Sequence, residues 1–351
     1  MEACVTTPSY QATRLASFES EIVASFMADS RLEVRLLQGG RYEASQERVL
    51  LPDSVLQVAS GNLPVLARGR HPTDRLHFGF TLAARGPGYM LGQTVVPGDV
   101  RVFTEGHELD YRTAPEVTLS GFQVTREEVE RAAVAHLGRP LPIPRTGWLH
   151  FLPTEAAAPL ARRIRSTLAV ASQSATGLSS SVARVLHEEL LREFIDALAA
   201  GLELSARGQQ QNSPRRGALT RRARDYLFAN LDQPFSLRAL SEAACCSERV
   251  LQYAFHEVYG VGPQGWFHAM KLNEANRELR AEGPGEVRVT DVALRWGFTH
   301  FGRFSVEYRR MFGERPSETL KRGSRSGKRN EKTTVESYRA SRAAPAVSGI
   351  G

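Results

Sequence analysis

The sequence predicts an α+β fold: an amino-terminal β-rich domain, sandwich- or cupin-like, with a helical pair, and a carboxy-terminal all-α domain with two helix-turn-helix units. Three observations lead to this prediction. Short apolar runs separated by turn residues fill 31–125, a helical period replaces them from Arg126, and one helical pattern occurs twice within 218–322. Many short strands with such punctuation are typical of a sandwich or barrel.

Five apolar runs in the β-rich region predict strands. Glycine and proline turns separate them, as at 86–88 and 97–99, where the chain is expected to change direction. Before them, the apolar residues of 15–26 recur at helical spacing, which predicts an amphipathic helix. The five runs contain Leu32, Val34 and Leu36; Val55, Leu56 and Val58; Leu76, Phe78 and Phe80; Val100, Val102 and Phe103; and Val117, Leu119 and Phe122.

Three helices are expected after the strands. Thr125 is a predicted N-cap with Glu128 three residues later, a capping box that starts a helix over 126–137. A helical pair then follows, over about 155–171 and about 181–200. The spacing of apolar residues changes here from every second residue to about every 3.6 residues. This change separates a sheet region from a helical region within one domain.

An apolar stripe runs along one face of the helix predicted at 181–200. Such a stripe either packs into the core of its own chain or forms the seam between two chains, and the sequence leaves both open. The seam alternative predicts a homodimer and assigns the contact to Leu186, Leu190 and Phe194.

Composition divides the chain into four parts. Residues 1–204 form the first domain, with strands over 31–125 and helices over 126–200. Residues 205–217 are polar and aperiodic, which predicts a linker, and 218–322 form the helical domain. Residues 323–351 are rich in Ser, Arg, Lys, Gly and Ala, which predicts a disordered basic tail.

The positive charge lies in the carboxy-terminal part. The net charge is −2 over 1–213, +5 over 214–322 and +4 over 323–351, which together give the +7 of the whole chain. This is the distribution that a polyanion-binding domain needs, although a basic face that only aids solubility gives the same numbers. Charge alone therefore leaves nucleic-acid binding as one of two alternatives.

Cysteine use and hydropathy predict a cytoplasmic protein. The three cysteines are Cys4, Cys245 and Cys246, and two adjacent residues with one distant residue make no disulfide framework. No basic stretch followed by an apolar segment opens the chain, so no signal peptide is expected. No run of about 18 apolar residues occurs, so no membrane partner is expected.

Residues 236–263 and 288–316 are an internal repeat. Four residues match at an offset of 52 and five at an offset of 53, so one residue is inserted between Ser247 and Leu251, where a turn tolerates it. The matched pairs are Leu240 and Val292, Ser241 and Ala293, Ala244 and Trp296, Cys245 and Gly297, Leu251 and Phe304, Phe255 and Tyr308, Tyr259 and Phe312, Gly260 and Gly313, and Pro263 and Pro316.

Each repeat predicts a helix, a tight turn and a second helix. Serine or threonine caps the helices, with Ser236 and Thr290 before the first ones, and Gly297 is expected to have a positive φ. Val250 is expected in the core of the first unit, and a helix over 263–281 joins the units. The residues that shape the two units are Cys245, Ser247, Leu251, Gly260, Pro263, Gly297, Thr299, Phe304, Gly313 and Pro316.

The region 218–322 resembles the DNA-binding domain of the AraC/XylS family of bacterial transcription regulators. The stretch GFTHFGRFSVEYRRMFGERPSETL (297–320) is similar to that family's signature almost throughout. The resemblance implies a regulator, and an activator, that binds double-stranded promoter DNA, with RNA polymerase as a partner. The amino-terminal part resembles the family's effector-binding or dimerisation domain, which implies a small-molecule effector and a homodimer.

The second helix of each unit is expected to enter a major groove with its amino-terminal end at the base edges. Arginine can hold guanine, and glutamine adenine, through two hydrogen bonds. The base-reading candidates are Arg249, Gln252 and Tyr253 in the first unit, and His300, Phe301, Gly302 and Arg303 in the second. The phosphate-contact candidates are Arg221, Arg222, Lys271, Arg309 and Arg310.

Three positions depart from the family pattern. Tyr253 and Val306 stand where the family often has arginine, which puts the usual contact there in doubt. Cys245 stands where the family commonly has glycine. The Cys245-Cys246 pair is interpreted as a tight turn of small side chains, with a redox switch as the alternative.

The amino-terminal domain shows no catalytic or cofactor motif, so neither an enzyme nor a cofactor is expected. Its histidines lack a metal-ligand spacing, so no metal is expected. Three hypotheses stay open: a regulator that responds to a ligand, a regulator controlled by a protein partner or by abundance, and a DNA-repair methyltransferase that uses Cys4. The histidines considered are His71, His77, His107 and His150.

Overall fold

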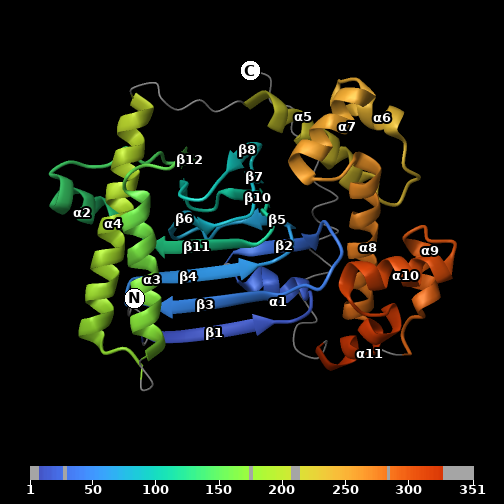
Figure 1. Cartoon of the computed structure of the whole chain (residues 1–351), viewed down its shortest axis with the longest axis horizontal. Helices are drawn as coiled ribbons and strands as arrows, with labels where there is room; N and C mark the ends of the chain where they lie inside the picture. The colour runs from blue at the N-terminus through green and yellow to red at the C-terminus, as the bar shows by residue number, and fades with distance from the viewer. Residues whose placement is uncertain (1–7, 27–29, 174–176, 207–213, 283–284, 327–351) are drawn as a thin grey trace. The chain divides into compact units, whose positions relative to one another are not determined.

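The computed structural model of the chain describes residues 8–26, 30–173, 177–206, 214–282 and 285–326 (Figure 1). The chain divides into two compact units. The first runs to Met270 and includes Met311–Gly313, and the second consists of Lys271–Arg310 and the chain from Glu314 on. The β-rich region and the first helix-turn-helix unit therefore belong to one compact body.

Two antiparallel sheets confirm the predicted β-rich architecture. The larger contains β1 (Ser9–Leu15), β3 (Ala44–Leu50), β4 (Ser54–Gly61), β6 (Leu76–Ala83), β9 (Val100–Phe103), β11 (Val117–Val124) and β12 (Trp148–Phe151). The smaller contains β2 (Arg31–Leu36), β5 (Val65–Arg70), β7 (Gly88–Met90), β8 (Gln93–Val95) and β10 (Glu108–Arg112). Their orders are β1-β3-β4-β11-β6-β9-β12 and β2-β5-β10-β7-β8.

The amino-terminal segment corrects the prediction of a helix over 15–26. Ser9–Leu15 is strand β1, paired antiparallel with β3, and Tyr10 donates its hydroxyl hydrogen bond to Glu47 on that strand at 2.6 Å. Only Ser20–Ser25 is helical, as α1. The apolar spacing gave no sign of β1, because its backbone partners come from a neighbouring strand that no local pattern reveals.

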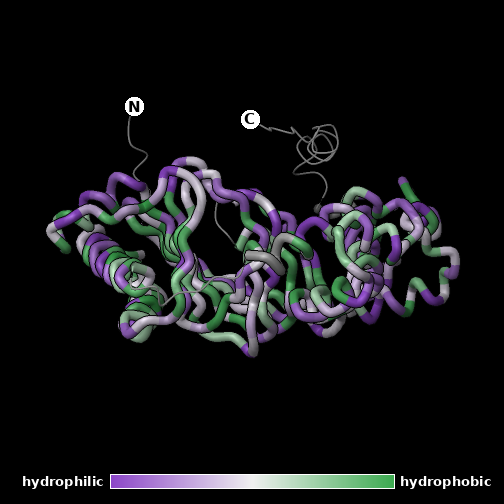
Figure 2. The backbone as a smooth tube through the Cα atoms, turned by 90° about the horizontal axis from the view of Figure 1, so that it is seen from above, coloured by the Kyte–Doolittle hydropathy of each residue, from purple (hydrophilic) through white to green (hydrophobic). Residues whose placement is uncertain are grey.

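The two faces of the larger sheet differ in chemistry because successive side chains point to opposite sides. On β6 and β11, Phe78 and Phe122 belong to the core beneath helices α3 (Ala157–Gln173) and α4 (Ser180–Ala206). The intervening His77 and Gln123 are also buried, but on the face turned to the smaller sheet. Figure 2 shows hydrophobic and hydrophilic stretches alternating along the helical pair, as expected of helices with one buried face.

Leu186, Leu190 and Phe194 are core residues of α4, so their assignment to a dimer seam was wrong. Their exposed fractions are 6%, 0% and 0%. The ring of Phe194 lies parallel to that of Phe122, with centroids 5.2 Å apart. Side chains already buried within one chain cannot bury further surface against a second chain. A homodimer stays a prediction, with its interface elsewhere.

Helix α2 (Arg126–Leu137) begins as predicted, because Thr125 accepts a hydrogen bond from the backbone N–H of Glu128 at 3.3 Å. The Glu128 carboxylate also lies 3.3 Å from Nε2 of His187 on α4. Nδ1 of His187 in turn lies 2.7 Å from the hydroxyl of Ser54 on β4. This buried chain of polar contacts ties α2, α4 and β4 together.

The carboxy-terminal helices match the predicted order. They are α5 (Pro214–Ala229), α6 (Leu237–Ala244), α7 (Glu248–Tyr259), α8 (Pro263–Ala281), α9 (Val289–Arg295), α10 (Phe301–Phe312) and α11 (Pro316–Ser326). Helix α8 has the bounds predicted for the joining helix. Its apolar residues include Trp266, Met270, Leu272, Ala275 and Leu279, which are all buried.

Helices extend into both segments that were expected to lack regular structure. Helix α4 continues to Ala206 and α5 begins at Pro214, so helix occupies both ends of the expected linker 205–217, and 207–213 lie outside the described residues. Helix α11 continues to Ser326, into the expected tail, and 327–351 also lie outside the described residues. Within the described ranges, no helix is long and apolar enough to cross a membrane.

Candidate nucleic-acid interface

The first helix-turn-helix unit consists of α6, a tight turn and α7. Ser236 caps α6 by accepting a backbone hydrogen bond at 3.2 Å. Cys245 ends α6 in the left-handed conformation, with a φ of 53°. The N–H of Cys246 then donates back to the carbonyl of Ser241 at 3.1 Å. Ser247 caps α7 by accepting a backbone hydrogen bond at 3.3 Å, so the unit has the predicted caps and turn.

The second unit repeats the hydrogen bonds of the first turn. Gly297 has a φ of 79°, which confirms the predicted positive value. The N–H of Phe298 donates to the carbonyl of Ala293 at 2.8 Å, the same bond that follows Cys245 in the first unit. The repeat seen in the sequence is therefore a repeat of backbone geometry.

In the second helix-turn-helix unit, the helices do not begin where the predicted threonine caps place them. Helix α9 begins at Val289, and its N-cap is Arg288, which makes no side-chain cap bond. Thr290 lies inside the first turn, so its predicted role as a cap was wrong. Helix α10 begins at Phe301, two residues after Thr299.

The second helices of the two units end in the same way. Gly260 ends α7 with a φ of 74°, and Pro263 begins α8. Gly313 follows α10 with a φ of 79°, and Pro316 begins α11. A left-handed glycine stops each helix, and a proline at the first helical position starts the next, which fits their backbone preferences.

Helix α7 exposes Arg249 and Tyr253 on the side opposite its core. Tyr253 is 67% exposed, whereas Leu251 is fully buried. Val250 was predicted in the core, but it is 48% exposed. It lies about 100° around the helix from Leu251, which takes it to the flank of the buried stripe. The amino-terminal end of α7 therefore presents a cation, an aromatic ring and an aliphatic side chain.

Gln252 faces a different way from the other two candidates on α7. It is half-buried, and its Oε1 lies 2.9 Å from the point where a Cβ on Gly262 would stand. The same point lies 3.2 Å from Nε2 of His256. Gln252 therefore packs over the turn after α7, and its role in reading bases stays a prediction.

All four candidates of the second unit are exposed around the start of α10. His300, Phe301, Gly302 and Arg303 precede or form its first turn, with Phe304 buried behind them at 1% exposure. One turn on, Val306 is 68% exposed. The centre of this face is therefore small and aliphatic, with positive charge at its edge.

The five phosphate-contact candidates fall into two groups. Arg309 and Arg310 are exposed at the end of α10, and Arg221 is exposed on α5. Arg222 is exposed but donates a hydrogen bond to the carbonyl of Ala244 at 3.2 Å, where α6 ends. In the second unit, Nζ of Lys271 lies 3.1 Å from the point where a Cβ on Gly297 would stand, so it covers the turn.

A buried phenol organises the second unit. Tyr308 on α10 is fully buried, and its hydroxyl accepts from Asn276 of α8 at 2.7 Å and donates to Thr319 of α11 at 2.9 Å. Burial raises the pKa of Tyr308 to about 12. The repeat predicts Tyr308 as core but does not reveal these partners, which come from helices on either side of α10 in the sequence.

In the first compact unit, which contains both sheets, α5 packs on the outer face of the smaller sheet. Arg224 forms an ion pair with Asp110 of β10, and the two side chains are 4% and 16% exposed. The guanidinium carbons of Arg35 and Arg68 each lie 5.0 Å from the ring centroid of Phe228. Cationic and aromatic groups therefore hold α5 to the sheet. The sequence contains no signal that pairs these residues.

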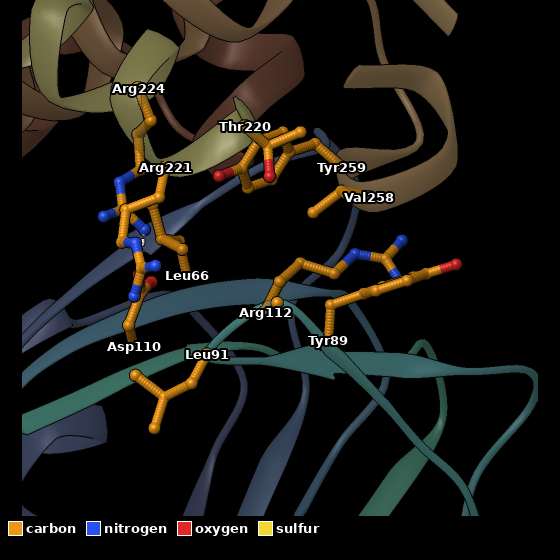
Figure 3. Close-up of a pocket in the computed structure, with 11 residues that line it drawn as sticks. Leu66, Tyr89, Leu91, Asp110, Arg112, Thr220, Arg221, Arg224, Val258 and Tyr259 are labelled. Carbon is orange, nitrogen blue, oxygen red and sulfur yellow. Dashed lines mark hydrogen bonds and ion pairs between the residues drawn. The ribbon is translucent and has the colours of Figure 1, made fainter. Parts of the chain in front are cut away.

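A small cavity lies beside this ion pair (Figure 3). Its volume is about 20 Å³, enough for one water molecule but not for a metabolite. Burial acts to lower the pKa of Arg224, but Tyr259, Asp110 and Asp225 together raise it above its ordinary value. The residues that line the cavity include Leu66, Tyr89, Leu91, Asp110, Arg112, Thr220, Arg221, Arg224, Val258 and Tyr259.

Histidine and cysteine are the residue types considered above for metal and thiol chemistry. In the part of the chain that the structure describes, no group of three His, Cys, Asp or Glu residues is placed to hold a metal ion. Cys245 is exposed, and burial raises the pKa of the Cys246 thiol, which disfavours its reactive thiolate form. Cys4, on which the methyltransferase hypothesis rests, lies outside the described residues.

Comparisons with known proteins find a family model and several curated relatives. A family model described as a helix-turn-helix domain matches residues 240–322. The chain is 32% identical over 149 residues to a probable thc operon regulatory protein of Rhodococcus erythropolis, which covers 41% of this chain and 45% of that protein. It is 38% identical over 97 residues to XylDLEGF operon transcriptional activator 3 of Pseudomonas putida, which covers 28% and 29%. The chain thus spans less than half the length of each relative.

One solved structure is similar in sequence to part of the chain. The probable AraC family transcriptional regulator from Rhodopseudomonas palustris CGA009 is 34% identical to this chain, over 30% of this chain and 96% of that one, with a TM-score of 0.28. With the repeated turns, the matched model and these relatives, the carboxy-terminal region is a helix-turn-helix domain similar to that of AraC/XylS-family transcription regulators.

Proposed function

We propose that the protein is a sequence-specific DNA-binding transcription regulator, and an activator, that inserts α7 and α10 into major grooves of promoter DNA. The observation that carries this proposal is the duplicated turn. Two left-handed residues, Cys245 and Gly297, each orient a following twelve-residue helix whose first turns are exposed. A major groove admits a helix in this way, with its amino-terminal residues at the base edges.

The proposed base-reading residues differ between the two units. In the first, Arg249 holds a guanine and Tyr253 contacts a base or a phosphate through its hydroxyl. In the second, Arg303 holds a guanine, and Val306 packs against a thymine methyl because an aliphatic side chain has no hydrogen bond to offer. His300, Phe301 and Gly302 set how closely the start of α10 approaches the bases.

The proposed phosphate contacts come from the exposed cations of α5 and α10. Arg309 and Arg310 lie one to two turns beyond Arg303, where a helix in the groove passes the backbone of the duplex. Arg221 and Arg222 offer the same chemistry from α5, and Lys271 from α8. Such contacts position the protein without selecting a sequence, and they make binding depend on salt.

Capture of genomic DNA fragments by the full-length protein at about 150 mM salt tests this proposal, followed by sequencing of the bound fragments. A motif with two conserved blocks is expected. Binding to unrelated fragments that disappears as salt rises, with no motif, would leave only the nonspecific electrostatic interaction and would contradict the proposal. Transcription from a captured promoter with purified RNA polymerase then tests activation, because an activator raises transcript yield.

We further propose that a small molecule in the amino-terminal sandwich controls DNA binding. Three side chains on the inner face of the larger sheet support this: Arg101, His77 and Gln123 are at most 4% exposed, although each carries polar groups. Gly79 and Gly121, which are paired across β6 and β11, leave room for two of these side chains. A Cβ on Gly79 would lie 3.1 Å from Nε of Arg101, and a Cβ on Gly121 would lie 2.7 Å from Cε1 of His77. A polar interior suits a polar ligand better than it suits a core.

Thermal unfolding of the protein against a panel of small metabolites tests effector control. A true effector raises the midpoint in proportion to its concentration and also changes affinity for the captured promoter. A compound that raises the midpoint but leaves DNA affinity unchanged binds without controlling. If no compound in the panel acts and the captured promoter is activated fully without one, control by a protein partner or by abundance is favoured.

A further inference from the structure

The two candidate base-reading arginines differ in how they are held. Arg303 donates its Nε hydrogen bond to Oε1 of Glu307 at 2.8 Å, one helical turn further along α10. Arg249 makes no ion pair or hydrogen bond with its side chain among the residues that the structure describes. Only the arginine of the second unit is therefore fixed before DNA arrives.

The contact with Glu307 leaves the Nη groups of Arg303 available for hydrogen bonds to a base. The guanidinium group has five N–H donors in a rigid fork, and Glu307 engages only the one on Nε. The side chain of Arg303 is 76% exposed, whereas that of Glu307 is 25% exposed. The carboxylate is thus set back toward the helix, and the Nη groups, which Glu307 does not engage, are available to the O6 and N7 atoms of a guanine.

The first unit has no counterpart of this pair. The internal repeat aligns Arg303 with Val250 and Glu307 with Ala254, at the offset of 53 that holds for the second helices. Ala254 is buried and Val250 is aliphatic. The pair is therefore not required to build a helix-turn-helix unit in this chain.

The negative charge of Glu307 is unfavourable for DNA binding as such. A carboxylate in the middle of a helix that enters DNA repels the phosphates, so it weakens binding to DNA of any sequence. The neighbouring Arg309 and Arg310 have the opposite effect. A cost of this kind is useful where the carboxylate fixes a base-reading side chain, because specificity is the ratio of specific to nonspecific binding.

We propose that Glu307 is a positioning residue for base recognition by Arg303: it holds the guanidinium fork end-on to one guanine of the second half-site and lowers binding to other sequences. This inference rests on the proposed function, because it requires α10 to enter a major groove. It makes the second half-site the more strictly read at the position of Arg303, and it makes Glu307 a determinant of specificity that touches no base.

The test compares Glu307→Gln, Arg303→Ala and the double variant in the full-length protein. The preferred site is first selected by the unchanged protein from random duplexes, and affinities are then measured for that site and for its single-base variants. Glu307→Gln is expected to relax one base position, with about tenfold weaker binding to the preferred site. It should bind random duplexes as well as or better than the unchanged protein. In the Arg303→Ala background, Glu307→Gln should change nothing at that position.

A matched control exists on α6, where Arg238 and Glu242 form the same kind of pair at 3.0 Å, four residues apart, on a helix that is not inserted. Glu242→Gln should leave every base preference unchanged. Arg303→Lys, which keeps the charge but loses the fork, should relax the same position as Glu307→Gln and provides a second variant if that one unfolds.

The outcomes separate this inference from the function on which it rests. If the unchanged protein selects no motif, the proposed function fails. If it selects a motif and Glu307→Gln keeps full preference at every position, the positioning role is wrong while the function stands. If Glu307→Gln relaxes a base even without the Arg303 side chain, Glu307 reads that base directly, and the positioning role is again wrong.

Discussion

Cys245 and Gly297 occupy the same place in the two turns and share the left-handed backbone conformation, with φ values of 53° and 79°. The hydrogen bond that closes each turn runs from the next residue to the carbonyl four residues before the left-handed one. Glycine adopts this conformation without a steric penalty, whereas cysteine does not. The first turn therefore carries strain that the second lacks.

Cys245→Gly is expected to stabilise the protein by about 1 kcal/mol, because relief of the strained backbone exceeds the extra entropy of glycine in the unfolded chain. Urea unfolding of the two proteins measures the difference. Gly297→Ala should act in the opposite direction, since Lys271 also crowds the position of its Cβ at 3.1 Å. Loss of stability in Cys245→Gly would mean that the thiol makes a contribution beyond its backbone.

Asp110→Asn is expected to destabilise the first compact unit by about 3 kcal/mol, because Arg224 would remain buried with only the half-exposed Asp225 as a carboxylate partner. A control lies two residues away on the same strand. Glu108 pairs with Arg70 at 2.9 Å, but both side chains are 69% exposed, so Glu108→Gln should cost less than about 1 kcal/mol. Equal effects of the two substitutions on the free energy of unfolding would show that burial of the Asp110 pair is unimportant.

The buried imidazoles predict that stability falls in mild acid. Burial lowers the pKa of His77 to about 3 and holds that of His71 well below its ordinary value. Both groups stay neutral in the folded protein but take up protons when it unfolds below about pH 6.5. Their contribution is complete above that pH and is lost as pH falls toward the folded pKa, by up to about 1.4 kcal/mol per pH unit for each histidine.

Urea unfolding at pH 7.5 and pH 5 measures this loss, and the variant His77→Gln separates it from the titration of carboxylates. The variant is expected to lose less stability between the two pH values than the unchanged protein. The interpretation fails if both proteins show the same difference, since the neutral state of His77 would then contribute nothing to folding.

The distinction between local and tertiary information explains which features could be predicted. The repeat, the turn at Gly297 and helix α8 follow from caps, glycines and apolar periodicity, which are written in neighbouring residues. Strand β1 could not be predicted in this way, because its partner lies in β3. The stripe on α4 was ambiguous for the same reason, since an apolar face looks alike whether Phe122 of its own chain or another chain covers it.

The candidate site shows the same limit at the level of single residues. Helical spacing predicts that Arg249 and Arg303 are exposed, but Val250 lies on the edge of the buried stripe, where a difference of a few tens of degrees decides burial. The partner of Arg303 was visible as an Arg–Glu pair four residues apart, a spacing known to bring side chains together. The Asp110 and Arg224 pair joins residues far apart in the sequence and carried no such signal.

Val306→Arg is expected to strengthen binding to all DNA sequences, because it adds a cation at the centre of the exposed face of α10, where the side chain is now aliphatic. The slope of the logarithm of affinity against the logarithm of salt concentration should steepen by about 1. Val134 on α2, which is 51% exposed, provides the control. Val134→Arg adds the same charge away from the interface, so an equal gain in DNA affinity there would mean that α10 does not meet the duplex.

Selection of binding sites by variants with one impaired unit tests most directly whether both units read DNA. The unchanged protein is expected to select two conserved blocks, about 10 base pairs apart between centres. A variant with Arg249→Ala and Tyr253→Ala should lose one block, and Arg303→Ala should lose preference within the other. If both variants lose preference in the same block, or if the unchanged protein selects only one block, two units reading two grooves would be contradicted.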